Sequence, residues 1–175
     1  LGKKIEPEIS ESVMLRYLGA PRFTNGVLPA PGHFGRITGL AWTSVGGEIL
    51  TIECMLLSGR GKVTLTGRLG DVMKESVQIA ISLVRARLKR YGVDPDLVRK
   101  TDIHIHVPEG AVPKDGPSAG IAMTLVILSA FTRIPVKPDI AFTGEVSLCG
   151  ELLPIGGLNE KSLAAKEAGV KTLYV

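Results

Sequence analysis

The amino-acid sequence predicts a mixed α/β fold of the α+β kind, built on a mixed sheet. Two segments suited to strands, residues 35–43 and 48–57, follow each other early in the chain, and helical and strand-like segments alternate after residue 71. Adjacent strands followed by such alternation favour this fold over a regular doubly wound sheet. With 45% hydrophobic residues in a length of 175, the chain can bury a substantial core in one domain.

The start of the chain differs from the rest. Residues 1–25 are polar and end in LGAPRF, so we expect a connecting arm from a preceding domain, with the folded domain in residues 26–175. The last residues, VKTLYV, suit a strand that is cut off in mid-domain.

The early strands are predicted to form a hairpin. Gly46 and Gly47 lie between them, and glycine readily adopts the positive φ angles of a tight turn. A second turn, SGRGK, leads into the strand-like run KVTLT.

The segment 71–91 has the periodicity of a helix, because apolar side chains recur at steps of three, four and seven. We expect Asp71 to cap its start and Gly92 its end. The apolar face consists of Met73, Val77, Ala80, Ile81, Val84 and Leu88.

The second half continues the alternation. The run TDIHIHV is predicted to be a strand, and a loop rich in Pro and Gly leads from it to a helix that begins near Ser118. The apolar stretch Ile121–Phe131 is too short to span a bilayer and should be a buried core helix. Strands separated by Gly turns are expected in residues 140–155.

Composition and charge narrow the class of function. Cys54 and Cys149 lie far apart in the sequence, which argues against a disulfide framework or a zinc site and fits a reducing compartment. The net charge of +4 is spread along the chain, apart from a basic cluster within residues 85–90. That cluster is compatible with nucleic acid, but a solvated helix face is the preferred interpretation. The basic cluster consists of Arg85, Arg87, Lys89 and Arg90.

No membrane anchor is expected.

Ser118 is the first residue whose sequence context suggests a catalytic role. In PKDGPSAG a Gly- and Pro-rich loop enters a helix at this serine, so that its hydroxyl can be exposed while nearby amides point to a common spot. Those amides and the helix dipole would stabilise the oxyanion of a tetrahedral intermediate. Taken alone, the motif leaves another interpretation open, because a serine near a helix start is often only a cap.

The position of Lys161 favours a catalytic role for Ser118 over a role as a helix cap. In PIGGLNEKSLAAKEAG we expect Asn159 to cap a short helix that ends at Gly169, which puts Lys161 in the first turn. The dipole and partial burial would both lower the pKa of this amine. A neutral lysine can take the proton of a serine hydroxyl, as in Ser-Lys hydrolases. Without the loop around Ser118, a surface lysine would be the preferred interpretation.

The motifs HIHVPEGAVPKDGPSAGIAM and FTGEVSLCGELLPIGGLNEK, with the separation of Ser118 from Lys161, resemble the Lon protease family in its bacterial and organellar branch. The resemblance covers about Tyr17 to Val175. It implies the proteolytic domain of an ATP-dependent serine endopeptidase, with Ser118 as nucleophile and Lys161 as general base through an acyl-enzyme.

For the whole protein, the resemblance implies unfolded or damaged polypeptides as substrates, a homohexameric ring and an AAA+ motor to which residues 1–25 would connect. ATP and Mg²⁺ would act in that motor, and neither a cofactor nor a metal is expected in this domain. The implied location is the cytoplasm, or the mitochondrial matrix for an organellar source.

The resemblance also implies supporting roles around the two catalytic candidates. Thr143, in FTGE, is expected to orient Lys161 by a hydrogen bond; a strand threonine satisfied by its neighbours is the alternative. Asp115, with its neighbours Gly116 and Pro117, lies in a loop that can occlude or open the oxyanion site, so Asp115 is a candidate gate. Otherwise it is an ordinary turn carboxylate.

Two further groups of residues are candidates. His104 and His106 share one face of a strand, but no third metal ligand is evident, and the resemblance implies a supporting or substrate-side role near the serine. The run GLAWTSVGG resembles the strand along which Lon-type enzymes bind an extended substrate through backbone hydrogen bonds, with broad specificity. Leu40, Ala41 and Trp42 would line it, and a core tryptophan is the alternative.

Two other classes of function compete with the peptidase. GHMP-type small-molecule kinases resemble Lon in broad fold and have their own Gly-rich loop, but GPSAG lacks their run of serines and no Walker A motif is present. A catalytically silent Lon-like assembly module is the other alternative.

Overall fold

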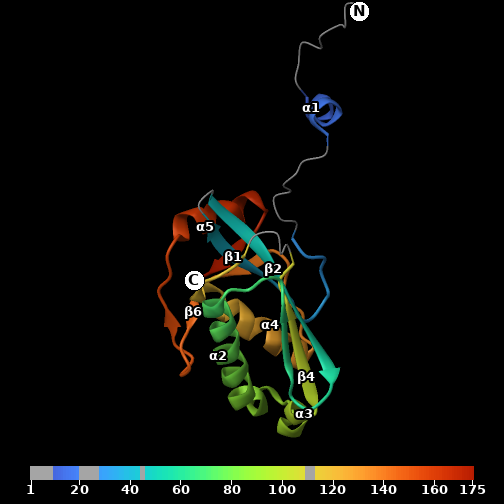
Figure 1. The fold of residues 1–175 in the computed structure, drawn as a ribbon, viewed down its shortest axis with the longest axis vertical. Coiled ribbons are helices and arrows are strands. Elements are labelled where there is room, and N and C mark those ends of the chain that lie inside the picture. The colour runs from blue at the N-terminus through green and yellow to red at the C-terminus, as the bar shows by residue number, and fades with distance from the viewer. Residues whose placement is uncertain (1–9, 20–27, 44–45, 109–112) are drawn as a thin grey trace, which may run out of the picture.

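A computed structural model describes residues 10–19, 28–43, 46–108 and 113–175. Within them, one mixed sheet has the strand order β3-β4-β2-β1-β5-β8, and β6 pairs with β7 in a small separate ribbon (Figure 1). This confirms the predicted mixed α/β fold. The strands are β1 (Arg36–Thr43), β2 (Gly46–Ser58), β3 (Val63–Thr66), β4 (Thr101–His106), β5 (Ile140–Phe142), β6 (Glu145–Val146), β7 (Leu152–Leu153) and β8 (Thr172–Tyr174).

Helices cover both faces of this sheet. On β1, a Cβ added to Gly39 would lie 3.6 Å from Ala122 of α4, whereas Leu40 packs with Ala165 of α5. Because neighbouring strand residues point to opposite faces, α4 and α5 lie on opposite sides of the sheet. The helices are α1 (Glu11–Leu18), α2 (Asp71–Arg87), α3 (Pro95–Arg99), α4 (Gly120–Thr132) and α5 (Leu158–Glu167), with the 3-10 turns η1 (Leu88–Tyr91) and η2 (Pro117–Ala119).

Strands β1 and β2 form the predicted antiparallel hairpin, but its two glycines are not the turn. Gly46 and Gly47 begin β2 and pair with Thr43 and Trp42. The turn, residues 44–45, lies outside the described residues. A Cβ on Gly47 would collide with the backbone carbonyl of Glu160, so the glycine lets the start of α5 approach the hairpin closely.

Helix α2 packs its predicted apolar face into the main core, but its predicted cap is wrong. Gly70 occupies the N-cap position and Asp71 is the first helical residue. Instead, Oδ1 of Asp115 accepts the amide of Met73 (3.0 Å), so the capping carboxylate comes from a distant loop. The 3-10 turn η1 extends the helix to Gly92, whose φ of 74° ends it as predicted. All six predicted core residues are buried: Met73, Val77, Ala80, Ile81, Val84 and Leu88.

Three further helices complete the domain. Helix α4 is the predicted buried helix. Helix α3 was absent from the sequence prediction, although Asp94 before Pro95 is a common pair at a helix start. The expected cap of α5 is wrong, because Gly157, with φ 68°, occupies the N-cap and Asn159 lies within the helix. Gly169, with φ 83°, follows its last turn as predicted.

The N-terminal segment and the surface complete the description. Of the expected arm, residues 10–19 are described and contain α1, which lies apart from the sheet (Figure 1), and its other residues lie outside the described ones. None of the described helices has both the length and the apolar character needed to cross a membrane.

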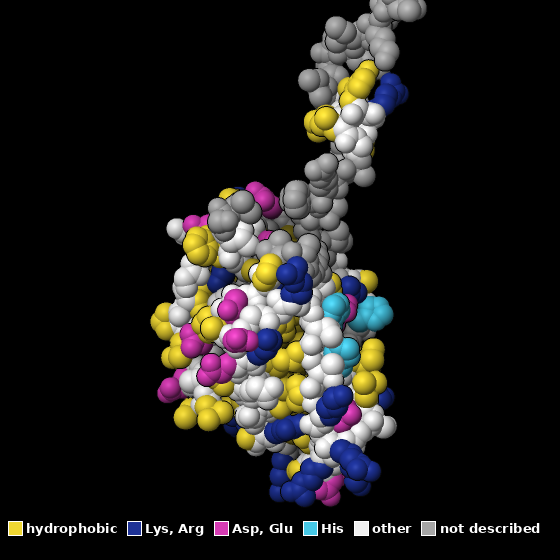
Figure 2. All heavy atoms as spheres, viewed as in Figure 1, with side chains coloured by type: hydrophobic (Ala, Val, Ile, Leu, Met, Phe, Trp, Pro, Cys, Tyr) yellow, Lys and Arg dark blue, Asp and Glu magenta, His cyan; other side chains and the backbone are white. Residues whose placement is uncertain are grey.

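Figure 2 shows Lys and Arg side chains gathered at the lower end of the molecule, where Figure 1 places α3. In the basic cluster, Arg87 donates to the carbonyl of Cys149 (2.7 Å) and Lys89 is exposed.

Candidate active site

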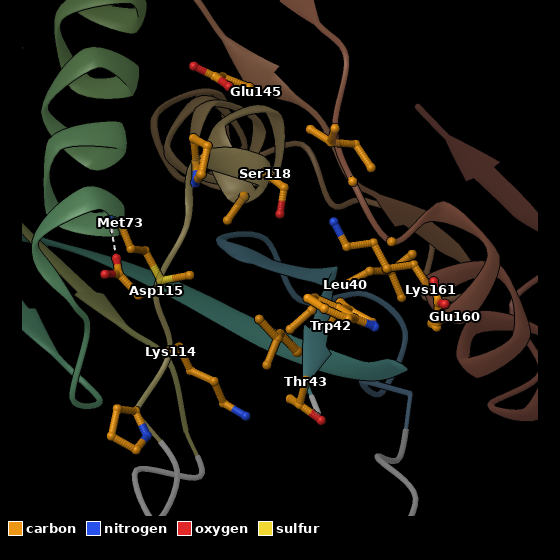
Figure 3. Close-up of a pocket in the computed structure, with 18 of the residues that line it drawn as sticks. Leu40, Trp42, Thr43, Met73, Lys114, Asp115, Ser118, Glu145, Glu160 and Lys161 are labelled. Atoms are coloured by element: carbon orange, nitrogen blue, oxygen red, sulfur yellow. Dashed lines mark hydrogen bonds between the residues drawn. The ribbon is translucent and has the colours of Figure 1, made fainter. Parts of the chain in front are cut away.

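One cavity of about 820 Å³ collects most of the predicted site residues (Figure 3). Its walls come from three separate parts of the chain: the end of β1, the loop that leads into η2, and the segment around the start of α5. Ser118 and Lys161 both line it. The cavity therefore joins helices that lie on opposite faces of the sheet.

Ser118 lies in η2, where the loop enters α4, as the sequence predicted. Its backbone is held by Gly144, which lies between β5 and β6: the amide of Gly144 donates to the Ser118 carbonyl (2.7 Å), and the amide of Ile121 donates to the carbonyl of Gly144 (3.1 Å). A Cβ on Gly120 would lie 2.9 Å from the amide nitrogen of Val146, so a larger residue would disturb this junction. The hydroxyl of Ser118 points into the cavity (Figure 3).

Lys161 lies in the first turn of α5 and is only 2% exposed. Its amide donates to the carbonyl of Gly157 (3.0 Å), which fixes the turn. Burial lowers the pKa of Lys161, because desolvation penalises the charged form. Figure 3 shows its amine and the Ser118 hydroxyl pointing toward one another across the cavity. The arrangement provides a hydroxyl and an amine biased toward its neutral form in the same site.

Lys114 is a second buried lysine of this cavity, and it was missed as a site residue at the sequence level. It is 3% exposed and forms an ion pair with Glu48 of β2. Burial lowers the pKa of Lys114, and the paired carboxylate opposes that effect because an opposite charge favours the ammonium. Its amine points away from Ser118 in Figure 3, so Lys161 is better placed to act as a base.

Asp115, Gly116 and Pro117 connect Lys114 to the serine. Oδ1 of Asp115 accepts the amides of Met73 (3.0 Å) and Gly116 (2.9 Å). Gly116 has φ 125°, a conformation that favours glycine. The carbonyl of Pro117 accepts from the hydroxyl of Ser76 (3.4 Å). Asp115 thus has a structural task, and its role as a gate remains a prediction.

Thr143 is completely buried beside the serine. Its hydroxyl donates to the backbone carbonyl of Ser118 (3.4 Å), so the contact found for it supports the serine segment. The expected hydrogen bond to Lys161 remains a prediction.

The three predicted substrate residues line the cavity, with different exposures. Leu40 is 1% exposed and belongs to the core, whereas Trp42 is 59% exposed and is not a core tryptophan. A Cβ on Gly157 would lie 2.9 Å from the indole of Trp42, so β1 packs directly against the segment that starts α5. Among the described strands, β5 pairs with β1 at Thr38 and Gly39 and ends before Leu40.

His104 and His106 lie on one face of β4, as predicted, but not in the cavity of Ser118. Both ring systems contact the hydroxyl of Thr66, at 3.0 Å from Nε2 of His104 and 2.7 Å from Nδ1 of His106. They line a separate cavity of about 380 Å³ with His33. In the part of the chain that is described, no group of three His, Cys, Asp or Glu side chains is arranged to hold a metal ion. A supporting role for the two histidines remains a prediction.

The comparison with known families agrees with this geometry. A family model described as the Lon protease (S16) C-terminal proteolytic domain matches residues 8–175. The chain belongs to the Lon protease family. The chain is 54% identical to Lon protease 1 of Syntrophobacter fumaroxidans over 174 residues, which is 99% of the chain, and 53% identical to the Lon protease of Escherichia coli (strain K12) over 168 residues, which is 96%. It spans about a fifth of the length of these curated relatives, 21% in both cases.

The Lon family membership confirms the resemblance inferred from the sequence motifs. The match includes both Ser118 and Lys161, and it begins at residue 8, within the segment expected to be an arm. The boundary between arm and domain remains a prediction. The match makes the cavity of the two residues the candidate active site of a Lon proteolytic domain.

Proposed function

We propose that this Lon proteolytic domain is a serine endopeptidase in which Ser118 is the nucleophile and Lys161 the general base. One observation carries the proposal: the two side chains come from the starts of different helices and face each other in one cavity. The burial of Lys161, which favours a neutral amine, supports its role as the base.

The reaction has two halves. As Oγ of Ser118 attacks the peptide carbonyl carbon, Nζ of Lys161 takes the hydroxyl proton, and it then gives that proton to the departing amine as the C–N bond breaks. In the second half, Lys161 takes a proton from a water that attacks the acyl carbon, and it returns that proton to Oγ of Ser118 as the ester bond breaks and the acid product leaves. Amides at the start of η2 would hold the oxyanion, aided by the positive end of α4.

Thr143 has a positioning role in this scheme. Its hydroxyl supports the Ser118 carbonyl, and a rotation toward Lys161 would let it orient the amine as well. Asp115 would act as a gate, because its carboxylate accepts the amide of Met73 and so connects the loop before Ser118 to α2 beside the oxyanion site.

The substrate is proposed to be an extended, unfolded polypeptide. The segment Leu40–Trp42 lines the cavity and continues β1 beyond the end of β5, which suits the addition of one more strand through backbone hydrogen bonds. Recognition through the backbone predicts broad sequence specificity, with the exposed indole of Trp42 adding a mild preference.

For the whole protein we propose an ATP-dependent protease that degrades unfolded or damaged proteins. Residues 1–25 would connect this domain to an AAA+ motor, where ATP and Mg²⁺ would act, and six copies would form a ring that encloses the active sites. The length of the curated relatives leaves room for such a motor, since the chain spans 21% of them. We propose the cytoplasm as the location, or the mitochondrial matrix for an organellar source.

The proposal is tested by peptide hydrolysis and by labelling with a serine-directed boronate or acylating reagent. We expect Ser118→Ala and Lys161→Ala to fold and to lose turnover by a factor of about 10³ or more. Lys161→Arg should also be inactive, because a guanidinium stays charged. The matched controls are Ser162→Ala and Lys166→Ala, exposed residues of α5, which should keep wild-type rates.

Three results would count against the assignment. Normal turnover by Lys161→Arg would exclude Lys161 as the base. A wild-type chain that neither hydrolyses peptides nor reacts at Ser118 would favour the silent assembly module, and nucleotide binding by this chain alone would favour the kinase.

A further inference from the structure

The loop that carries the nucleophile is tied to the hairpin by an ion pair that the mechanism above does not use. We call residues 113–118 the serine loop. Lys114 extends from it to Glu48 of β2, and both residues lie beside the cavity, Lys114 within its lining. Glu48 pairs with Ala41 across the hairpin, so it lies directly opposite the segment of β1 that is proposed to bind the substrate. We call this segment, Leu40–Trp42, the substrate strand.

The other polar contacts of the serine loop lead elsewhere. The backbone of Lys114 joins the segment before α2, through its amide to Arg68 (3.3 Å) and its carbonyl to the amide of Gly70 (2.7 Å). Asp115 and Pro117 also bond to α2, at Met73 and Ser76. The ion pair of Lys114 with Glu48 is thus a polar link from this loop to the hairpin.

A buried ion pair contributes little to the stability of a fold. Lys114 is 3% exposed, and Oε1 of Glu48, the atom that its amine contacts, is buried as well. Replacing a buried ion pair by apolar side chains of similar volume is often neutral or stabilising, whereas removing one partner leaves an unpaired charge. A charged pair does, however, favour one arrangement of the two segments that it joins.

We propose that the Lys114–Glu48 ion pair is a positioning latch, which holds the serine loop at a set distance from the substrate strand and thereby aligns Ser118 with the bound peptide. This inference rests on the proposed function of Ser118. Lys114 is a positioning residue in this account, because its amine points away from the serine and toward the hairpin (Figure 3). A small misplacement of a nucleophile can slow a reaction a hundredfold, so such a latch would control rate more than binding.

The test compares Lys114→Met, Glu48→Gln and the double variant. We expect each single variant to lower kcat for a peptide by about tenfold or more, with KM changed less than about threefold. The double variant should lose no more than either single one, because the two changes break the same link. The pH of half-maximal rate should stay that of the wild type, since Lys161 remains the base.

Hydrogen exchange of the full chain gives a second readout that needs no activity. Amides of peptides spanning 113–118 should exchange about tenfold faster in the two single variants. The matched control is Lys171→Met, which removes an exposed lysine from its ion pair with Asp139 and should change neither exchange nor kcat. If Lys114→Met does not fold, Glu48→Gln keeps the side-chain shape and decides the question.

The outcomes separate the latch from the chemistry. Faster exchange with slower kcat supports the latch. Unchanged exchange, an unchanged kcat, or single effects that multiply in the double variant overturns it. A shifted pH profile also overturns it, because Lys114 would then titrate in the reaction. If Ser118 of the wild type is unreactive while exchange responds as expected, the ion pair still holds the serine loop, but the proposed function fails and with it the alignment of Ser118 for catalysis.

Discussion

The same side chain has different chemistry in different places of this domain. Lys161 is buried, and no ion pair joins it to a carboxylate of the described residues, so burial favours its neutral form. Lys114 is equally buried but has Glu48 as a counter-ion. Lys166, five residues beyond Lys161 in α5, is exposed. Environment therefore selects the candidate base among lysines that look alike in the sequence.

Replacing Lys161 by methionine should stabilise the domain at neutral pH. Because burial lowers the pKa of Lys161 below 10.5, the unfolded chain binds more protons than the folded chain between the lowered value and 10.5, so stability rises with pH in that window. Lys161→Met removes this dependence. We expect a gain of about 1–3 kcal/mol in the free energy of unfolding at pH 7 and a smaller gain at pH 10, with peptide hydrolysis lost.

Urea unfolding followed by circular dichroism at both pH values measures this difference. Lys166→Met, on the exposed side of α5, should leave the pH dependence as in the wild type. A lower stability of Lys161→Met at pH 7 would contradict the assumed cost of burying the amine.

The starts of the helices are where the elements of this domain meet. Neither α2 nor α5 has a side-chain cap from its own N-cap residue, which is a glycine in both cases. Helix α2 is capped by Asp115 of the serine loop, and α5 starts against the backbone of Gly47. The elements that carry the two catalytic candidates are thus positioned by contacts with neighbouring elements.

The cap of α2 can be tested by comparing two aspartates. Asp115→Ala should lower the free energy of unfolding by about 0.5–2 kcal/mol, because the amide of Met73 loses its acceptor. Asp71→Ala should cost clearly less than Asp115→Ala, since Asp71 is exposed and its ion pair with Lys74 lies at the surface. Urea unfolding measures both, and Asp115→Asn should recover part of the loss. A larger effect at Asp71 would restore the capping role predicted from the sequence.

The contact between the hairpin and α5 can be tested with two neighbouring glycines. Gly47→Ala places a Cβ against the carbonyl of Glu160, so the first turn of α5 must move, and Lys161 with it. We expect a loss of about 1–3 kcal/mol in stability and a kcat lowered by about tenfold or more.

The control for this change is Gly46→Ala, whose Cβ would meet no atom within 4 Å but would strain a backbone with φ 128°. It should cost stability without a specific loss of kcat. Equal effects of both variants on kcat would show that the approach of α5 is not what positions Lys161.

The candidate active site is built from elements that pack on both faces of the sheet. Ser118 belongs to the segment that starts α4, and Lys161 to α5, which packs on the opposite face. The end of β1 lies between them and provides Leu40 and Trp42 to the cavity. Any loss of packing on either face would therefore separate the hydroxyl from the amine.

This dependence predicts a strong effect of mutations in the main core. Ile127 of α4 is completely buried, and Ile127→Ala should lower the free energy of unfolding by about 2–5 kcal/mol. Ile134→Ala removes the same atoms from a residue that is 64% exposed and should cost about 0.5 kcal/mol or less. Thermal unfolding and peptide turnover, measured together, should show activity falling with the folded fraction for Ile127→Ala. Similar stabilities of the two variants would contradict the assignment of the core.

Sequence patterns were sufficient for several features that depend on spacing within one segment, although the caps predicted at Asp71 and Asn159 were wrong. The apolar face of α2, the buried character of α4, the position of Ser118 at a helix start and that of Lys161 in a first turn all follow from spacing within one segment. The family motifs added the pairing of these two residues.

Other features depend on which distant segments meet, and spacing within a segment carries no information on that. The cap of α2 comes from Asp115, 42 positions beyond Met73, and the counter-ion of Lys114 comes from β2. For the same reason His104 and His106 share the predicted strand face but line another cavity. Local periodicity reflects contacts between residues close in the chain, whereas burial, capping and charge pairing are set when the sheet and its helices pack together.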